Sequence, residues 1–196
     1  MNIRLQKSVL RLASVLLLFP GMAMAHTGVG ETTGFLHGLS HPITGVDHLI
    51  AMVAVGLWAA QMGGRALWIV PSVFVGVMFL GGIAGITGMA IPFMEGGILV
   101  SLLVLGVLLA GAFKFPLLVS SSIVGFFALF HGLAHGAEMP ASLGAVSYCI
   151  GFVFSTALLH VVGIVSGLTL RRLNLGMLSR YAGGAVALSG IYFAMA

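Results

Sequence analysis

Long apolar segments, separated by short stretches of charged and turn-forming residues, constrain the fold of this chain most strongly. A helix needs about 20 apolar residues to cross the hydrocarbon core of a bilayer. Sixty per cent of the 196 residues are hydrophobic and six per cent are charged, whereas a soluble domain carries about 25% charged residues. The chain lacks the polar side chains that would cover a soluble core, and we therefore expect an all-α integral membrane protein.

Charges, glycines and prolines divide the chain into six apolar segments of sufficient length. We expect six transmembrane helices, over residues 42–61, 66–86, 96–113, 115–134, 143–170 and 176–195. Small residues let helices approach closely inside a membrane. The segments Gly81-x-x-x-Gly85 and Gly163-x-x-x-Gly167 are therefore predicted to serve helix packing.

The first 25 residues have the three parts of a cleaved signal peptide. Three basic residues precede an apolar run that ends at Phe19, and Ala23-Met24-Ala25 provides a small-x-small cleavage site. Cleavage would leave a six-helix transmembrane domain, residues 26–196, with His26 as its new N-terminus. The alternative is an uncleaved first helix.

The basic residues predict the orientation of these helices. A cleaved signal and six spans place both termini on the outer face. The bases of the mature chain then fall in or beside connections on the inner face, namely Arg65, Lys114, Arg171, Arg172 and Arg180. This distribution agrees with the excess of Lys and Arg in cytoplasmic connections.

Composition also excludes several classes of function. The pI is near 9.9, but no basic stripe with interleaved aromatic residues follows the N-terminal bases, so we do not expect a nucleic acid partner. The single cysteine, Cys149, excludes an internal disulfide and any C-x-x-C motif. Nitrogen and oxygen atoms must therefore provide the ligands of any metal.

A histidine motif occurs twice. His37-Gly38-Leu39-Ser40-His41 precedes the first span, and His131-Gly132-Leu133-Ala134-His135 closes the fourth, both on the predicted outer side. Helical residues four positions apart point from the same face, so His131 and His135 are predicted to form a two-imidazole site suited to Ni, Zn, Cu or Co. Gly132 stands where an H-E-x-x-H protease has its catalytic glutamate, which argues against peptide hydrolysis.

Further polar residues open the first span. Pro42 is predicted at the first helical position, which places Asp47 and His48 about 8–9 Å inside the helix start. An ionised carboxylate at that depth needs a partner, and a divalent cation is the expected one. Along an ideal helix His41 and His48 lie about 10 Å apart, so they would serve successive ion positions unless the helix breaks at Gly45.

Three more residues complete the candidate set. Glu138 follows His135 by three positions and adds a carboxylate to the second cluster. His160 is predicted as an inward station in the fifth helix, and His26 could chelate a metal with its amine and imidazole. A lone histidine near a helix end is usually bonded to backbone or water. The clustering of these side chains in a chain with so few polar residues favours a metal path instead.

The chain resembles the HupE/UreJ family of bacterial nickel permeases, which are associated with hydrogenase and urease gene sets. The resemblance rests on the H-P-x-x-G-x-D-H signature at 41–48, the second motif at 131–138, the signal peptide and the six spans. It implies transport of Ni²⁺ or Co²⁺ from the periplasm across the bacterial inner membrane to supply a metalloenzyme. The implied metal contacts are His41, Asp47, His48, His131 and His135, to which position adds His37 and Glu138.

The metal ion would be cargo, so no permanent cofactor is expected, and no nucleotide-binding loop is present. Membrane lipid and a cytoplasmic nickel chaperone are candidate partners, whereas the oligomeric state is not indicated. A transporter is expected rather than an enzyme. Two alternatives stay open: an intramembrane zinc-dependent hydrolase of the lipid amidase type, and a haem-binding subunit with histidine axial ligands.

Overall fold

The computed structural model describes residues 34–89, 91–139 and 144–195, all within one compact unit of residues 32–196. The described residues form seven α-helices and no strand, which confirms the predicted all-α class. The predicted signal peptide and His26 lie outside the described residues.

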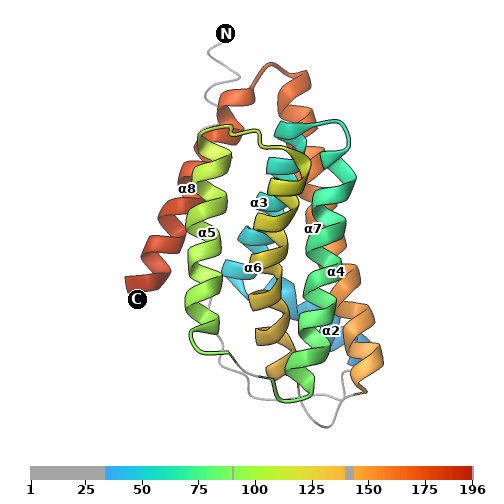
Figure 1. Cartoon of the computed structure of the whole chain (residues 1–196). Coiled ribbons are helices and arrows are strands. Elements are labelled where there is room, and N and C mark those ends of the chain that lie inside the picture. The colour runs from blue at the N-terminus through green and yellow to red at the C-terminus, as the bar shows by residue number, and fades with distance from the viewer. Residues whose placement is uncertain (1–33, 90, 140–143, 196) are drawn as a thin grey trace. The chain divides into compact units, whose positions relative to one another are not determined.

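Short connections join the helices. Their bounds are α2 (Gly34–Thr44), α3 (Val46–Met62), α4 (Ala66–Ile86), α5 (Met94–Ala110), α6 (Leu117–Ala137), α7 (Ala145–Arg172) and α8 (Gly176–Met195). The helices from α3 to α8 run alternately in opposite directions (Figure 1), so the connections that follow α3, α5 and α7 lie at one end. The connections that follow α4 and α6 lie at the other end, beside α2.

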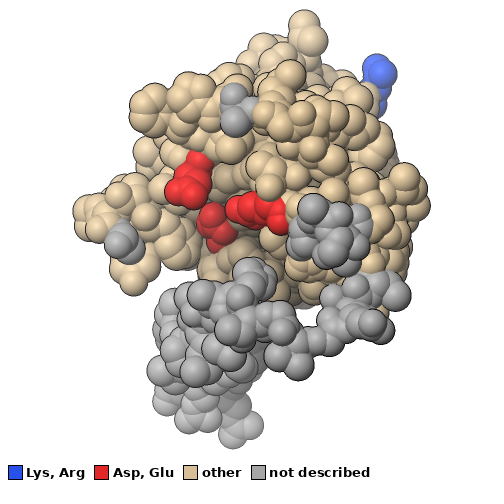
Figure 2. Space-filling model, turned by 90° about the horizontal axis from the view of Figure 1, so that it is seen from below, with Lys and Arg blue, Asp and Glu red and all other residues tan. Residues whose placement is uncertain are grey.

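Basic side chains lie at one of these ends, and the described acidic side chains lie at the other. The end that we call the basic end carries Arg65, Lys114, Arg171, Arg172 and Arg180. The opposite end, the acidic end, carries the described acids Asp47, Glu95 and Glu138. Figure 2 looks onto the acidic end and shows its carboxylates gathered near the middle of that face.

Three helices, α4, α6 and α7, are long and apolar enough to cross a membrane. The bent pair α2 and α3 gives a fourth candidate if it counts as one span. Among the described helices, α5 is apolar but has only 17 residues, and α8 does not meet the same criterion. The fold is thus that of a helical membrane protein with three or four clear spans, and the six-span arrangement stays a prediction.

The helix predicted over 42–61 is wrong in one respect, because the structure has two helices there. Pro42 lies inside α2 rather than at a first helical position. Gly45 then adopts an extended conformation, with φ −80° and ψ 107°, and the axes of α2 and α3 differ by 80°. Glycine is the weakest helix former after proline. Asp47 favours a new helix start just beyond it, because a carboxylate is stabilised at a helix N-terminus.

The other five predicted helices are present, with ends that move by no more than three residues. Glycines let them approach closely: α4 packs on α6, α5 on α8, and α7 on both α2 and α3. A Cβ built on Gly132 would lie 3.0 Å from the Cα of Gly81, and one on Gly163 would lie 2.9 Å from the Cα of Gly56. The predicted packing role of the small-residue segments is confirmed.

Candidate metal site

The break at Gly45 brings the two histidine motifs together. His41 of α2 and His135 of α6 have ring centroids 4.7 Å apart. His48, in the first turn of α3, has its ring centroid 4.2 Å from that of His135. Because α2 and α3 meet at 80°, imidazoles that a straight helix would hold about 10 Å apart contact the same ring of α6.

Each copy of the motif also packs a glycine against another helix. Gly38 abuts the carbonyl of Tyr148 on α7, and Gly132 abuts the carbonyl of Met78 on α4, with no space for a Cβ at either position. The two histidines of a copy share one helix face, and the glycine lies on a different face. A shared local requirement, two imidazoles on one face and close packing on another, explains the similarity of the copies.

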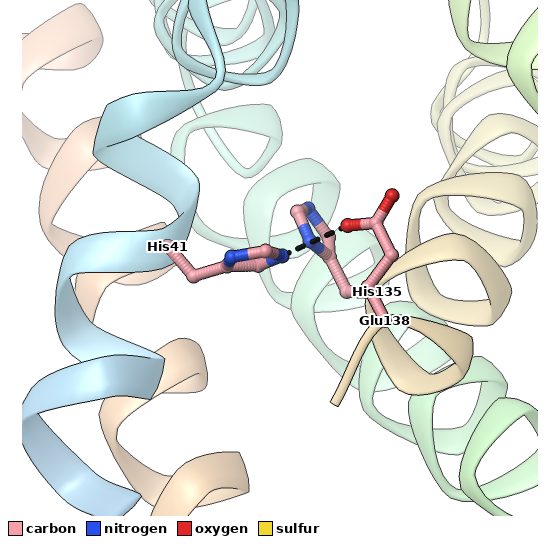
Figure 3. A group of neighbouring side chains, drawn as sticks. All are labelled: His41, His135 and Glu138. Carbon is pink, nitrogen blue, oxygen red and sulfur yellow. Dashed lines mark hydrogen bonds and ion pairs between the residues drawn. The ribbon is translucent and has the colours of Figure 1, made fainter. Parts of the chain in front are cut away.

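The first of two histidine groups opens to the surface. We call it the mouth group, and it consists of His41, His135 and Glu138 (Figure 3), each with one ligand atom within 4.8 Å of those of the others. His41 Nε2 lies 3.0 Å from Glu138 Oε2. The side chain of Glu138 is 57% exposed and that of His41 only 12%. The hydrogen bond with His41 lowers the pKa of Glu138, which keeps the carboxylate ionised and able to bind a cation.

The second group is deeper. This buried imidazole group consists of His48, His131 and His135, and the ring centroids of His48 and His131 lie 4.9 Å apart. Within the described residues, His48 Nε2, His131 Nδ1 and both ring nitrogens of His135 have no hydrogen-bond partner. An unsatisfied buried polar group costs about 1–3 kcal/mol. A metal ion of the kind that prefers imidazole ligands would remove that cost.

Neighbouring residues determine which nitrogens of this group carry lone pairs. Asp47 Oδ1 accepts hydrogen bonds of 2.9 Å from both the Nδ1–H and the backbone N–H of His48. Ser101 donates its hydroxyl hydrogen to the carbonyl of Ile98 at 2.6 Å, so its oxygen must accept from His131 Nε2–H at 3.1 Å. The free lone pairs are then on His48 Nε2 and His131 Nδ1. Such partners behind a histidine orient it toward a metal.

Phe74 contacts both the buried imidazole group and His160. The Phe74 ring, which is fully buried in α4, has its centroid 5.5 Å from that of His131 and 5.1 Å from that of His160. His160 is 2% exposed, and within the described chain neither of its ring nitrogens has a partner. The Phe74 ring therefore lies in contact with both His131 and His160.

The remaining candidate residues lie around these groups. His37 flanks the mouth group, with its ring centroid 5.8 Å from that of His41 and 5.9 Å from that of Tyr148. Asp47 lies behind His48 and is held by two hydrogen bonds to it. Direct metal contacts by His37 and Asp47 stay predictions.

Sequence reasoning missed several residues that contact the histidines, namely Ser101, Phe74, Tyr148 and Phe152. Ser101 and Phe74 show why. Ser101 is the only polar side chain of α5 beyond its first turn, and a lone hydroxyl in an apolar helix was a usable signal. Phe74 gave no such signal, because it is one of 13 phenylalanines in an apolar chain. Only the packing of α4 against α6 and α7 shows that Phe74 contacts two imidazoles.

The fold and the site define a helical membrane protein with a histidine cluster between its helices. The family model described as HupE / UreJ protein matches residues 14–193, and the chain belongs to this family. Protein HupE of Rhizobium leguminosarum bv. viciae is 48% identical over 176 residues, which cover 89% of this chain and 91% of that protein. No solved structure matches significantly.

Proposed function

We propose that this chain is a permease that carries Ni²⁺, or Co²⁺, from the periplasm to the cytoplasm across the bacterial inner membrane. The observation that carries the proposal is that His135 belongs to both the mouth group and the buried imidazole group. The HupE/UreJ family is associated with nickel and cobalt transport for hydrogenase and urease. The ion is cargo that supplies such a metalloenzyme, and a cytoplasmic nickel chaperone is its expected recipient.

Capture begins at the mouth group. Glu138 attracts the hydrated cation, because it is ionised and more than half exposed. His41 and His135 then replace water molecules. Since His135 also faces His48, the ion can move to the buried imidazole group without losing all its protein ligands at once. Conduction needs sites that bind an ion firmly enough to admit it and weakly enough to release it.

The ligand atoms favour first-row transition metals. The buried imidazole group offers nitrogen lone pairs on His48 and His131, with carboxylate and hydroxyl oxygens behind them. Imidazole suits Ni, Co, Cu and Zn, whereas Mg and Ca prefer oxygen ligands.

We place the helices α3 to α8 across the membrane with the basic end in the cytoplasm. The basic residues lie at one end and the described acids at the other, where Figure 2 shows their carboxylates, and this separation of charge supports the orientation. The mouth group then faces the periplasm. The 17 residues of α5 extend about 26 Å at 1.5 Å per residue, somewhat less than the hydrocarbon thickness. A slight local thinning of the bilayer accommodates a span of this length.

Radioactive nickel uptake by cells with and without the chain tests the proposal. His135→Ala removes the ligand that the two groups share, so uptake is expected to fall to the level of cells without the chain. Ser147→Ala is the matched control, since Ser147 is half-buried at the same end and, among the described residues, its hydroxyl bonds only to the Gly144 carbonyl. Membrane abundance is measured by immunoblot for both variants.

Normal uptake by an abundant His135→Ala variant would contradict this site assignment. Stoichiometric zinc that survives purification, together with chelator-sensitive hydrolysis, would instead favour the hydrolase alternative. A Soret band in the purified chain would favour the haem-binding subunit.

A further inference from the structure

A hollow of about 390 Å³ lies at the basic end, between the α3–α4 and α5–α6 connections. Its apolar wall includes Met62, Phe115 and Leu117. Two exposed cationic side chains also line it, Arg65 from the first connection and Lys114 from the second. The hollow thus combines an apolar surface with two positive charges from segments far apart in the sequence.

These two cations differ from the arginines beside them. Arg171 donates to the carbonyl of Ala60, and Arg180 donates to the carbonyl of Ala110, both at 2.8 Å. Those two arginines therefore satisfy carbonyls at the C-terminal ends of α3 and α5. In the described part of the chain, the side chains of Arg65 and Lys114 make no hydrogen bond or ion pair. The described acids lie at the opposite end and provide no counter-ion for this pair.

The connections that carry the two cations are fixed to the helices. Trp58 of α3 donates its indole N–H to the carbonyl of Phe113 at 2.9 Å. The Ser120 hydroxyl of α6 lies within hydrogen-bonding distance of two residues that line the hollow. It is 3.3 Å from Met62 Sδ and 3.5 Å from the Phe115 carbonyl oxygen. The hollow is therefore built into the helix ends rather than formed by free loops.

We propose that this hollow binds the phosphate of an anionic phospholipid, with part of an acyl chain on its apolar wall. Basic pockets between membrane helices on the cytoplasmic side suit anionic lipid headgroups. The apolar wall favours a lipid over a free anion, because an inorganic phosphate would leave it in water. The inference rests on the proposed placement of the basic end at the cytoplasmic surface, and it does not depend on nickel transport.

Native mass spectrometry of the full-length chain in detergent tests this site, with phosphatidylglycerol or phosphatidylcholine added. The wild-type chain is expected to retain phosphatidylglycerol in preference to phosphatidylcholine. The double variant Arg65→Gln/Lys114→Gln is expected to bind phosphatidylglycerol about thirtyfold more weakly, the factor that two basic side chains give at an anionic surface. Arg172→Gln removes one charge from the same end without lining the hollow, and it should leave binding unchanged.

Two further measurements keep the outcome unambiguous. Lys114→Arg retains the charge and should retain the lipid, which separates a lost charge from a lost fold. Equal retention of the two lipids, unchanged binding by the double variant, or full competition by inorganic phosphate would each overturn the inference. Nickel uptake is measured on the same variants, so a chain that transports nickel but does not select the anionic lipid contradicts this inference alone.

Discussion

At the scale of single residues, Asp47 acts on the site through its neighbour. Its carboxylate accepts two hydrogen bonds from His48, which leaves His48 Nε2 directed at the other imidazoles with no partner among the described residues. The side chain lies in the first turn of α3, where the helix dipole stabilises a negative charge. The charge of Asp47, which is costly to place in an apolar helix, is thus stabilised by the N-terminus of α3 and by two hydrogen bonds to His48.

Replacing this carboxylate should weaken metal binding without removing it. Asp47→Ala is expected to lower nickel affinity about 10- to 100-fold, the usual loss when a partner behind a metal-binding histidine is removed. Asp47→Asn keeps an acceptor for the His48 ring and should lose less. Isothermal titration of the purified chain measures both variants, and equal affinity in all three proteins would contradict the positioning role.

A substitution at Phe74 is expected to impair nickel transport while leaving nickel binding intact. Phe74→Trp places a larger ring against His131 and His160, both of which Phe74 contacts. Nickel binding by the purified variant should stay near the wild-type value, because no ligand changes, whereas uptake should fall strongly. Overpacking in a core costs about 1–3 kcal/mol, so the thermal midpoint is recorded as a control. Wild-type uptake by the variant would place the ion path elsewhere.

At the scale of helices, the break at Gly45 determines the geometry of the site. A Cβ on Gly45 would lie 3.1 Å from His48 Nδ1 and 3.2 Å from Asp47 Oδ1. Alanine would therefore press on the pair that orients His48, and it would also favour a continuous helix, since it is a much better helix former than glycine. Both effects move His48 away from His135.

Gly45→Ala is accordingly expected to lower nickel affinity by about tenfold, which corresponds to about 1.4 kcal/mol of binding free energy. Gly76→Ala is the matched control, because a Cβ on Gly76 meets no other atom within 4 Å. Circular dichroism should show the same helix content for both. Equal nickel affinity in the two variants would mean that the helix break at Gly45 does not determine the geometry of the metal site.

The helices themselves were largely predictable from sequence. A break at Gly45 was one of two open alternatives, and the sequence did not decide between them. Apolar length alone located α4 and α8 correctly, and the four-residue spacing predicted that His131 and His135 share a face of α6. Pro42 and Gly45 each allow several backbone paths. The choice between a helix start and a helix break depends on α2 packing against α7, where Gly38 abuts Tyr148. Contacts of this kind between distant segments cannot be predicted from the local sequence.

At the scale of the whole molecule, charge and ligands are segregated along the helices. The described carboxylates and the mouth group occupy one end, and the basic residues occupy the other. The buried imidazole group, Phe74 and His160 follow one another into the interior. This order fits a path that starts at the acidic end and runs beside Phe74 toward His160.

Nickel entry into proteoliposomes made from the purified chain tests the central claim most directly, with a nickel-quenched fluorophore trapped inside. The wild-type chain is expected to quench the dye when nickel is added outside, and His135→Ala in vesicles of equal protein content is expected to behave like empty vesicles. Absence of quenching by a wild-type chain that binds nickel, or equal quenching by the two proteins, would contradict transport through the two groups that share His135.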